Sequence, residues 1–355
     1  MLAKKRKLVE AKEYFRLNKN HVLCGTCERR CLVGPSEKGY CGNKANIDGK
    51  LYNIGYGLLS AVESRPIEIK PLFHFWPNST ALTFSGWGCN FHCPWCQNFP
   101  LSFNAPKFNG NYIIPPEKLV EKALINDDEG LCASFNEPTI HLEYLVDAFQ
   151  KAHEHGLYNT IVSNGFMTIS SLKALKEAGL SGLNFDIKGC RETYRKFLGA
   201  LDPMIVFRNA KIALDWGIHV EIVFLVVTGA NDNDECIEWV LKNHADILGE
   251  NVPLHINRYY PAWKYHKPPT SINKLLKIYE KAKKEYGIKY VYVGNIGDLR
   301  YETTYCPKCG KPLIVRSSYR VIEYKLTKDN RCPYCNFKIN IVGNYVPHKP
   351  LSYFI

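Results

Sequence analysis

The stretch FSGWGCNFHCPWCQN, residues 84–98, overlaps an apolar run at 81–87 and carries three cysteines, Cys89, Cys93 and Cys96. We expect the run to be a buried strand that ends in a cysteine-bearing loop. The spacing Cys-x3-Cys-x2-Cys suits a loop wrapped around one corner of a four-iron cluster. A cluster that only transfers electrons usually has a cysteine on each iron, so three cysteines leave one iron open. A zinc site made by the three cysteines with His92 or a distant ligand is the alternative.

An open iron can be chelated by a small molecule that presents an amine and a carboxylate together. The methionyl end of S-adenosylmethionine presents both groups. An electron from the cluster then cleaves the sulfonium and yields methionine and a 5′-deoxyadenosyl radical. This interpretation therefore also requires a low-potential electron donor.

Outward from this loop, the chain alternates between β-branched apolar runs and segments with helical periodicity. The alternation is typical of repeated βα units with a parallel sheet. Helices are expected at 115–125, with a proline near its start, and at 140–156 and 171–179, each ended by a glycine. At least six βα units predict an α/β fold with a full or partial (β/α) barrel, and an open doubly wound sheet is the competing fold. The expected strands are 81–87, 131–135, 158–163, 181–187, 219–227, 252–258 and 289–294.

Ligands of a barrel gather at the carboxyl ends of its strands. Polar motifs follow successive expected strands at this end, and their joint occurrence is more informative than any one of them. They are NEPT (136–139), SNG (163–165), DIKG (186–189), HINRYYP (255–261) and VGN (293–295).

With GCNFHCPWCQN, these motifs resemble the radical S-adenosylmethionine (radical SAM) enzymes, in the branch that contains pyruvate formate-lyase activating enzyme. The resemblance covers about residues 62–300. The stretches RPIEIKPLFHFWPNST, SFNEPT, NFDIKG, VEIVFLVVTGAND and YVYVGNIG are similar to the radical enzyme of the AmmeMemoRadiSam system. Members of that family carry a cysteine-bearing N-terminal segment similar to CGTCERRCLVGPSEKGYCG (24–42), and archaeal versions can end in a zinc ribbon.

The resemblance implies roles for the strand-end residues. Cys89, Cys93 and Cys96 would hold a [4Fe–4S] cluster. Asn136 and Glu137 match the motif that meets the methionyl amino group of S-adenosylmethionine, although the superfamily more often has Gly-Gly-Glu-Pro here. The ribose or carboxylate region would be bound by Ser163 and Asn164, and the site would be lined from the next strand by Asp186 and Lys188.

Two further residues are candidates for catalysis. His255 lies on an expected strand and would either face the cavity as a substrate contact or proton carrier, or be an ordinary core residue. Cys190 directly follows DIKG, near the expected mouth of the barrel, where a thiol could donate a hydrogen atom. The family pattern has an aromatic residue at that position.

Eight of the 14 cysteines form two further groups. CPKCG and CPYCN supply Cys306, Cys309, Cys332 and Cys335 in the layout of a structural zinc ribbon, which often serves as a docking module. The N-terminal group is less easily assigned, and we favour a second zinc over a second iron–sulfur cluster that relays electrons. Its members are Cys24, Cys27, Cys31 and Cys41.

The formal net charge of +12 is concentrated at the two ends. Residues 1–20 carry seven Lys or Arg and two acids, and residues 301–355 carry nine and three. No membrane span or secretory signal is recognisable, so we expect a cytoplasmic protein with no membrane partner. The expected domains are an N-terminal basic helix and four-cysteine segment (1–78), the barrel (79–300) and the ribbon (301–355).

Three classes of function follow. The favoured one is a radical SAM enzyme that abstracts hydrogen from a protein or peptide, as the activating-enzyme resemblance suggests. The basic ends and the ribbon make modification of tRNA or other RNA an alternative. The third class is a metal-stabilised binding protein without radical chemistry, which the strand-end motifs disfavour.

Overall fold

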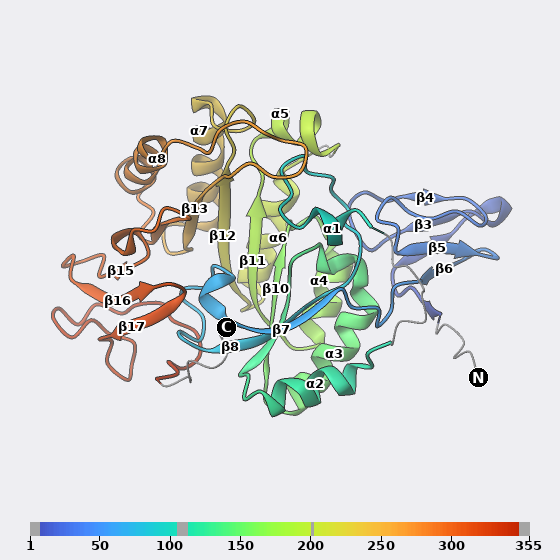
Figure 1. Ribbon diagram of the computed structural model, residues 1–355, viewed down its shortest axis with the longest axis horizontal. Helices are drawn as coiled ribbons and strands as arrows, with labels where there is room; N and C mark the ends of the chain where they lie inside the picture. Colours follow the sequence, from blue (N-terminus) through green and yellow to red (C-terminus); the bar gives the residue numbers. More distant parts are fainter. Residues whose placement is uncertain (1–7, 105–112, 200–201, 348–355) are drawn as a thin grey trace.

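The computed structural model describes residues 8–104, 113–199 and 202–347. An eight-stranded sheet lies at its centre, in the spatial order β14-β13-β12-β11-β10-β9-β8-β7 (Figure 1). Strands β8 to β14 are parallel, and β7 pairs antiparallel with β8. The strands are β7 (Ala61–Pro66), β8 (Thr80–Ser85), β9 (Gly130–Ala133), β10 (Tyr158–Ser163), β11 (Leu180–Ile187), β12 (His219–Val226), β13 (Leu254–Arg258) and β14 (Val291–Gly294).

The spatial order of the parallel strands follows their order in the chain. A doubly wound sheet reverses its order at a switch point, and no reversal occurs here, so that competing fold is excluded. No hydrogen-bonded pairing joins β7 to β14 within the described residues, so closure of the sheet into the predicted full barrel is not seen. All seven strands expected from the sequence are present, whereas β7 was not expected, and the sheet therefore begins ahead of residue 79.

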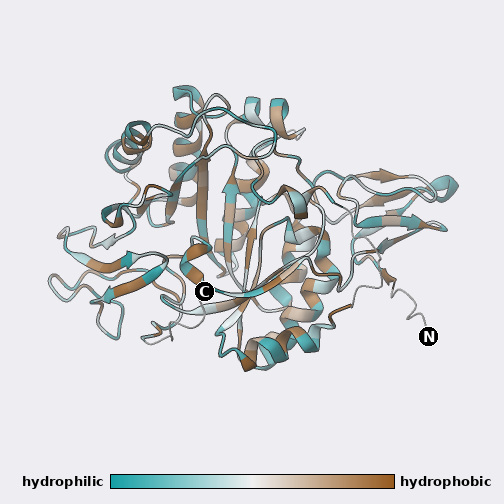
Figure 2. Cartoon of the chain, in the orientation of Figure 1, coloured by the Kyte–Doolittle hydropathy of each residue, from teal (hydrophilic) through white to brown (hydrophobic). Residues whose placement is uncertain are grey.

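Helices cover the outer face of the sheet, and apolar strand residues such as Val220, Ile222 and Phe224 of β12 are buried (Figures 1 and 2). The predicted helices at 115–125, 140–156 and 171–179 are confirmed as α2 (Pro116–Ile125), α3 (Leu142–Glu154) and α4 (Ile169–Glu177). The other long helices are α6 (Met204–Asp215), α7 (Asp234–Asn243) and α8 (Ile272–Lys284), and the short ones are α1 (Phe99–Ser102) and α5 (Arg191–Thr193).

The N-terminal segment forms two three-stranded sheets beside the eight-stranded sheet (Figure 1). The predicted basic helix is wrong for the described residues 8–20, where two short strands lie, because these residues pair with neighbouring strands. A buried carboxylate on α3 anchors the N-terminal segment. Glu143 accepts hydrogen bonds from Lys44 Nζ, from Asn53 Nδ2 at 2.8 Å and from Lys12 N at 3.0 Å. The two sheets consist of β1 (Val9–Glu10), β6 (Lys50–Asn53) and β5 (Lys44–Ile47), and of β2 (Tyr14–Arg16), β3 (Val22–Cys24) and β4 (Leu32–Val33).

The C-terminal segment forms a three-stranded sheet on the opposite side of the molecule (Figure 1). Its fully buried Arg316 donates to Phe73 O at 2.6 Å and to Thr304 Oγ1 at 2.8 Å. The chain around Phe73 in turn contacts the barrel strands, because His74 N donates to Glu221 Oε1 on β12 at 2.7 Å. The ribbon strands are β15 (Thr304–Tyr305), β16 (Pro312–Ser317) and β17 (Arg320–Tyr324). Within the described residues, no helix has the length and apolarity needed to cross a membrane.

Candidate functional site

A cavity of about 400 Å³ opens at the carboxyl ends of the parallel strands. It brings together the three loop cysteines and all six strand-end residues that the resemblance assigned to cofactor binding. Its lining includes Cys89, Cys93, Cys96, Asn136, Glu137, Ser163, Asn164, Asp186 and Lys188. We call it the strand-end cavity.

The cysteine loop, residues 86–98, continues from β8 and is fixed by two buried aromatic residues. Phe91 packs against Phe166 with ring centroids 5.1 Å apart, and Trp95 packs edge-on against Tyr265 at 5.5 Å. The two contacts hold the backbone of the loop on either side of Cys93. Trp95 lies within the quoted stretch GCNFHCPWCQN, and its contact with Tyr265 gives it an anchoring position in the structure.

The three cysteines of the loop are half-buried. Burial raises the pKa of Cys93 to about 12 and raises the pKa of Cys89 and Cys96 as well. A metal must therefore displace protons from these thiols when it binds. Among the described residues, only the ribbon cysteines have sulfur atoms that all lie within 4.8 Å of one another, so the loop cysteines are not closed around a single ion. Three thiols that line one cavity are a donor set that suits a cluster with one open iron.

Glu137 joins the ends of β9 and β10. Its Oε1 accepts from Ser163 Oγ at 2.8 Å and from Thr139 N and Oγ1 at 3.0 and 2.6 Å, and its Oε2 accepts from Asn164 N at 2.8 Å. Burial raises the pKa of Glu137, and these donors lower it in part. Asn164 Nδ2 in turn donates to Asn90 Oδ1 in the cysteine loop at 2.6 Å. One buried network thus positions the loop relative to two strand ends.

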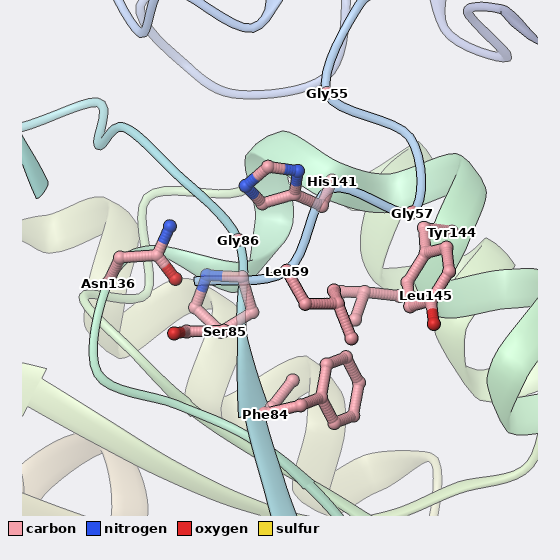
Figure 3. Close-up of a pocket in the computed structure, with 12 residues that line it drawn as sticks. Gly55, Gly57, Leu59, Phe84, Ser85, Gly86, Asn136, His141, Tyr144 and Leu145 are labelled. Carbon is pink, nitrogen blue, oxygen red and sulfur yellow. The ribbon is translucent and has the colours of Figure 1, made fainter. Parts of the chain in front are cut away.

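Asn136 lines both the strand-end cavity and a second, smaller one of about 10 Å³, which is shown in Figure 3. The smaller cavity is close to the size of a single water molecule. Asn136 Nδ2 donates to Gly88 O at 2.8 Å, and Oδ1 is buried with no hydrogen-bond partner among the described residues. An unpaired amide oxygen on a residue that lines the same cavity as three cysteines fits a ligand that carries an ammonium group.

Asp186 and Lys188 form an ion pair at the end of β11, with Nζ 2.9 Å from Oδ2. Burial lowers the pKa of Lys188, but Asp186 and the Cys93 thiol outweigh it, and the net effect is to raise the pKa. Lys188 thus keeps its charge at the cavity wall, next to the cysteine loop.

Lys70 was missed by the sequence analysis, although it lies in the quoted stretch RPIEIKPLF. It lines the strand-end cavity, is only 5% exposed, and has its ammonium 4.2 Å from the centre of the Phe135 ring. Burial lowers its pKa to about 8. Phe135 holds this contact with φ +70°, a conformation that favours glycine and fits the glycine common at this position in the superfamily motif. The signal in the sequence that could have indicated its burial is the position of Lys70 between the apolar residues Ile69 and Pro71.

The two predicted catalytic residues do not line the strand-end cavity. His255 is buried, donates from Nε2 to Glu221 Oε2 at 2.6 Å, and stacks on Tyr292 with centroids 5.1 Å apart. It is held as a core residue, which was one of the two interpretations of the sequence. Cys190 N donates to Cys236 Sγ at 2.9 Å at the start of α5, and its own Sγ lies 3.7 Å from Thr193 Oγ1. The geometry gives neither residue contact with the expected reaction centre.

The ribbon cysteines are arranged for one ion. Cys306 and Cys335 have sulfur atoms 3.4 Å apart, and those of Cys309 and Cys332 are 3.7 Å apart. Zn–S bonds of about 2.3 Å in a tetrahedron place sulfur atoms about 3.8 Å from one another. The donor set and its dimensions therefore fit a closed four-thiolate metal site.

The N-terminal cysteines lie beside the cysteine loop. Burial raises the pKa of Cys27, the nearby Cys24 and Cys41 thiols raise it further, and a hydrogen bond with the Asn90 side chain lowers it. Arg29 Nε donates to Asn90 O in the same loop. The pKa of Tyr40 is raised by burial, lowered by Arg29 and raised by the nearby thiols of both cysteine groups.

Comparison with known proteins extends these observations. Residues 85–243 match the model of the Radical SAM superfamily. The chain is 36% identical over 335 residues to the uncharacterized protein MJ0808 of Methanocaldococcus jannaschii, covering 94% of this chain and 99% of that protein. It is also 28% identical to the GTP 3′,8-cyclase of Campylobacter curvus, over 41% of this chain and 46% of the cyclase.

Two solved structures are similar over part of the chain. A domain of pyruvate-formate lyase-activating enzyme from Bacteroides vulgatus has a TM-score of 0.40 at 15% identity, over 47% of this chain and 99% of that domain. SuiB of Streptococcus suis bound to S-adenosylmethionine has a TM-score of 0.48 at 12% identity, over 62% of this chain and 50% of SuiB.

Proposed function

The chain belongs to the radical SAM superfamily, and from this premise we propose that Cys89, Cys93 and Cys96 hold a [4Fe–4S] cluster and that the strand-end cavity binds S-adenosylmethionine. The observation that carries the proposal is that one cavity unites three thiols with polar side chains from three successive strand ends. When bound and reduced, the cluster supplies the electron that cleaves S-adenosylmethionine to methionine and a 5′-deoxyadenosyl radical.

Different residues of the cavity bind different groups of the cofactor or position the cysteine loop. Asn136 Oδ1, for which the described part of the chain supplies no hydrogen-bond donor, accepts from the methionyl ammonium group. The four hydrogen bonds of Glu137 keep the ends of β9 and β10 in register with the cysteine loop. Lys188 provides a positive charge for the carboxylate, and Phe91 and Trp95 exclude water behind the loop.

We propose that the reaction is hydrogen abstraction from a protein or peptide. Aromatic side chains next to the cavity support a polypeptide substrate. Phe103 packs against Trp263 with centroids 4.2 Å apart, and the exposed Phe99 stacks on the same ring at 6.0 Å. Phe99 and Phe103 directly follow Asn98 and Ser102, which line the cavity. The aromatic rings offer an apolar surface to a substrate side chain that enters the cavity.

The substrate class is tested by deuterium transfer. Protein and RNA fractions from cells grown in D2O are incubated separately with the anaerobic, iron-loaded enzyme, a low-potential reductant and S-adenosylmethionine. Mass spectrometry then measures deuterium in the 5′-deoxyadenosine formed, with Cys93→Ala as the control. Deuterium from the protein fraction is expected. Deuterium only from RNA would replace the proposal with the RNA alternative, and its absence from both would contradict a macromolecular substrate.

A further inference from the structure

The N-terminal cysteine group directly contacts the cysteine loop of the proposed active site. Gly88, in that loop, has φ +88°, and a Cβ added there would lie 2.3 Å from Cys41 O, so the two backbones approach as closely as glycine allows. Tyr40, next to Cys41, stacks on His92 with ring centroids 4.5 Å apart. The two cysteine groups are therefore in direct contact, through Cys41 and Gly88 and through Tyr40 and His92.

The four N-terminal cysteines converge from two turns. Cys24 N donates to Cys31 O at 2.9 Å, which pairs the first and third cysteines across β3 and β4. A Cβ added to Gly39 would lie 3.9 Å from Cys31 Sγ, so the turn that carries Cys41 packs on the third cysteine. Cys24 and Cys27 are buried, and Cys31 and Cys41 are half-buried.

These cysteines differ from the ribbon cysteines in their spacing. The four ribbon sulfur atoms all lie within 4.8 Å of one another, whereas the N-terminal four, all of them in the described part of the chain, form no such set. A single zinc ion requires sulfur atoms about 3.8 Å apart. A cubic cluster binds each thiolate at a different iron and accommodates a wider set. In this respect the N-terminal cysteines match the three cysteines of the loop.

We propose that Cys24, Cys27, Cys31 and Cys41 hold a second iron–sulfur cluster that passes electrons to the cluster of the active site. Four thiolates leave no open iron, which suits electron transfer rather than binding of S-adenosylmethionine. A one-electron, low-potential carrier reduces the second cluster and is itself oxidised by one electron. The second cluster then returns to its oxidised state by giving that electron to the first. The relay rests on the proposed function, but the metal site does not.

The test measures iron, sulfide and zinc per chain after anaerobic reconstitution of the full-length protein. We expect about eight irons in wild type, from two four-iron clusters, and one zinc in the ribbon. Cys31→Ser and Cys41→Ser change half-buried ligands and should lower the iron content to about four. The matched variant, with Cys89, Cys93 and Cys96 all replaced by alanine, should also keep about four irons. Its reduced cluster should give an electron paramagnetic resonance spectrum that S-adenosylmethionine does not change.

The triple variant decides the question even if a serine variant fails to fold, because its N-terminal segment is unaltered. Wild type with about four irons and two zinc ions, or a triple variant without iron, would overturn the inference. Failure of the proposed function would look different. The triple variant would then keep its iron, and the spectrum of wild type would not respond to S-adenosylmethionine. In reduced wild type, the adjacent clusters should also broaden each other's spectra, and two independent narrow signals would count against the relay.

Discussion

Lys70→Met should stabilise the protein at neutral pH. Lys70 is 5% exposed, and burial lowers its pKa from the ordinary 10.5 to about 8. One pKa unit corresponds to about 1.36 kcal/mol, so keeping this side chain charged in the native state costs about 3 kcal/mol. Between pH 8 and 10.5 the native state releases the proton while the unfolded chain keeps it, so wild-type stability rises with pH across this window. A methionine can still pack on Phe135.

Urea unfolding, followed by tryptophan fluorescence from pH 7 to pH 10.5, measures this effect. Lys70→Met should exceed wild type by about 3 kcal/mol at pH 7, and the difference should vanish near pH 10.5. Lys122→Met, at an exposed position on α2, is the matched control and should change stability by less than about 0.5 kcal/mol. Equal stability of Lys70→Met and wild type at pH 7, or a difference that does not vary with pH, would refute the reasoning.

The remaining predictions concern the other parts of the molecule. Cys332→Ser should release one zinc and make residues 301–355 sensitive to protease while cleavage of S-adenosylmethionine persists; loss of the active-site cluster would show that the parts are coupled. His255→Phe leaves Glu221 Oε2 buried without its donor, so it should lower stability by about 1–3 kcal/mol and still permit cofactor cleavage, and abolished cleavage in a folded variant would restore His255 as a catalytic residue. If RNA is the substrate, binding of total tRNA should fall with salt with a log–log slope of about −0.7 per neutralised phosphate, and deletion of residues 1–20 should weaken it. Binding unaffected by that deletion would contradict a role for the basic N-terminus.

The parallel strands were predictable because strands buried on both faces are rich in apolar and β-branched residues, which form recognisable runs in the sequence. The run at 219–227 is apolar and β-branched, and it corresponds to β12 within one residue at its C-terminal end. In contrast, β7 contains charged residues and ends in proline, since it is a half-buried edge strand. Its strand conformation is fixed by antiparallel pairing with β8, and the local sequence of β7 does not predict that pairing.

The candidate site was predictable in its residues but not in its internal geometry. Motif order along the chain placed Cys93, Glu137 and Lys188 near one another because parallel strands align their carboxyl ends. The saturation of Glu137 by four donors depends on Ser163 and Asn164 folding back from the next strand, which no local pattern encodes.

The positions of His255 and Lys70 depend on contacts between distant parts of the chain. The pairing of His255 with Glu221 requires two strands to be neighbours with their side chains on the same face. Lys70 is buried because the segment that follows β7 runs along the cavity wall. A single sequence shows the charge of such a residue but not its surroundings.

The central claim, that the three loop cysteines support cleavage of S-adenosylmethionine, is tested most directly by measuring 5′-deoxyadenosine. The anaerobic, iron-loaded protein is reduced with dithionite, and the product is quantified for wild type, Cys93→Ala and the control Cys132→Ala, whose thiol is buried in the sheet away from the cavity. Wild type and Cys132→Ala should form 5′-deoxyadenosine, and Cys93→Ala should form none. Product from Cys93→Ala at the wild-type rate would contradict the account.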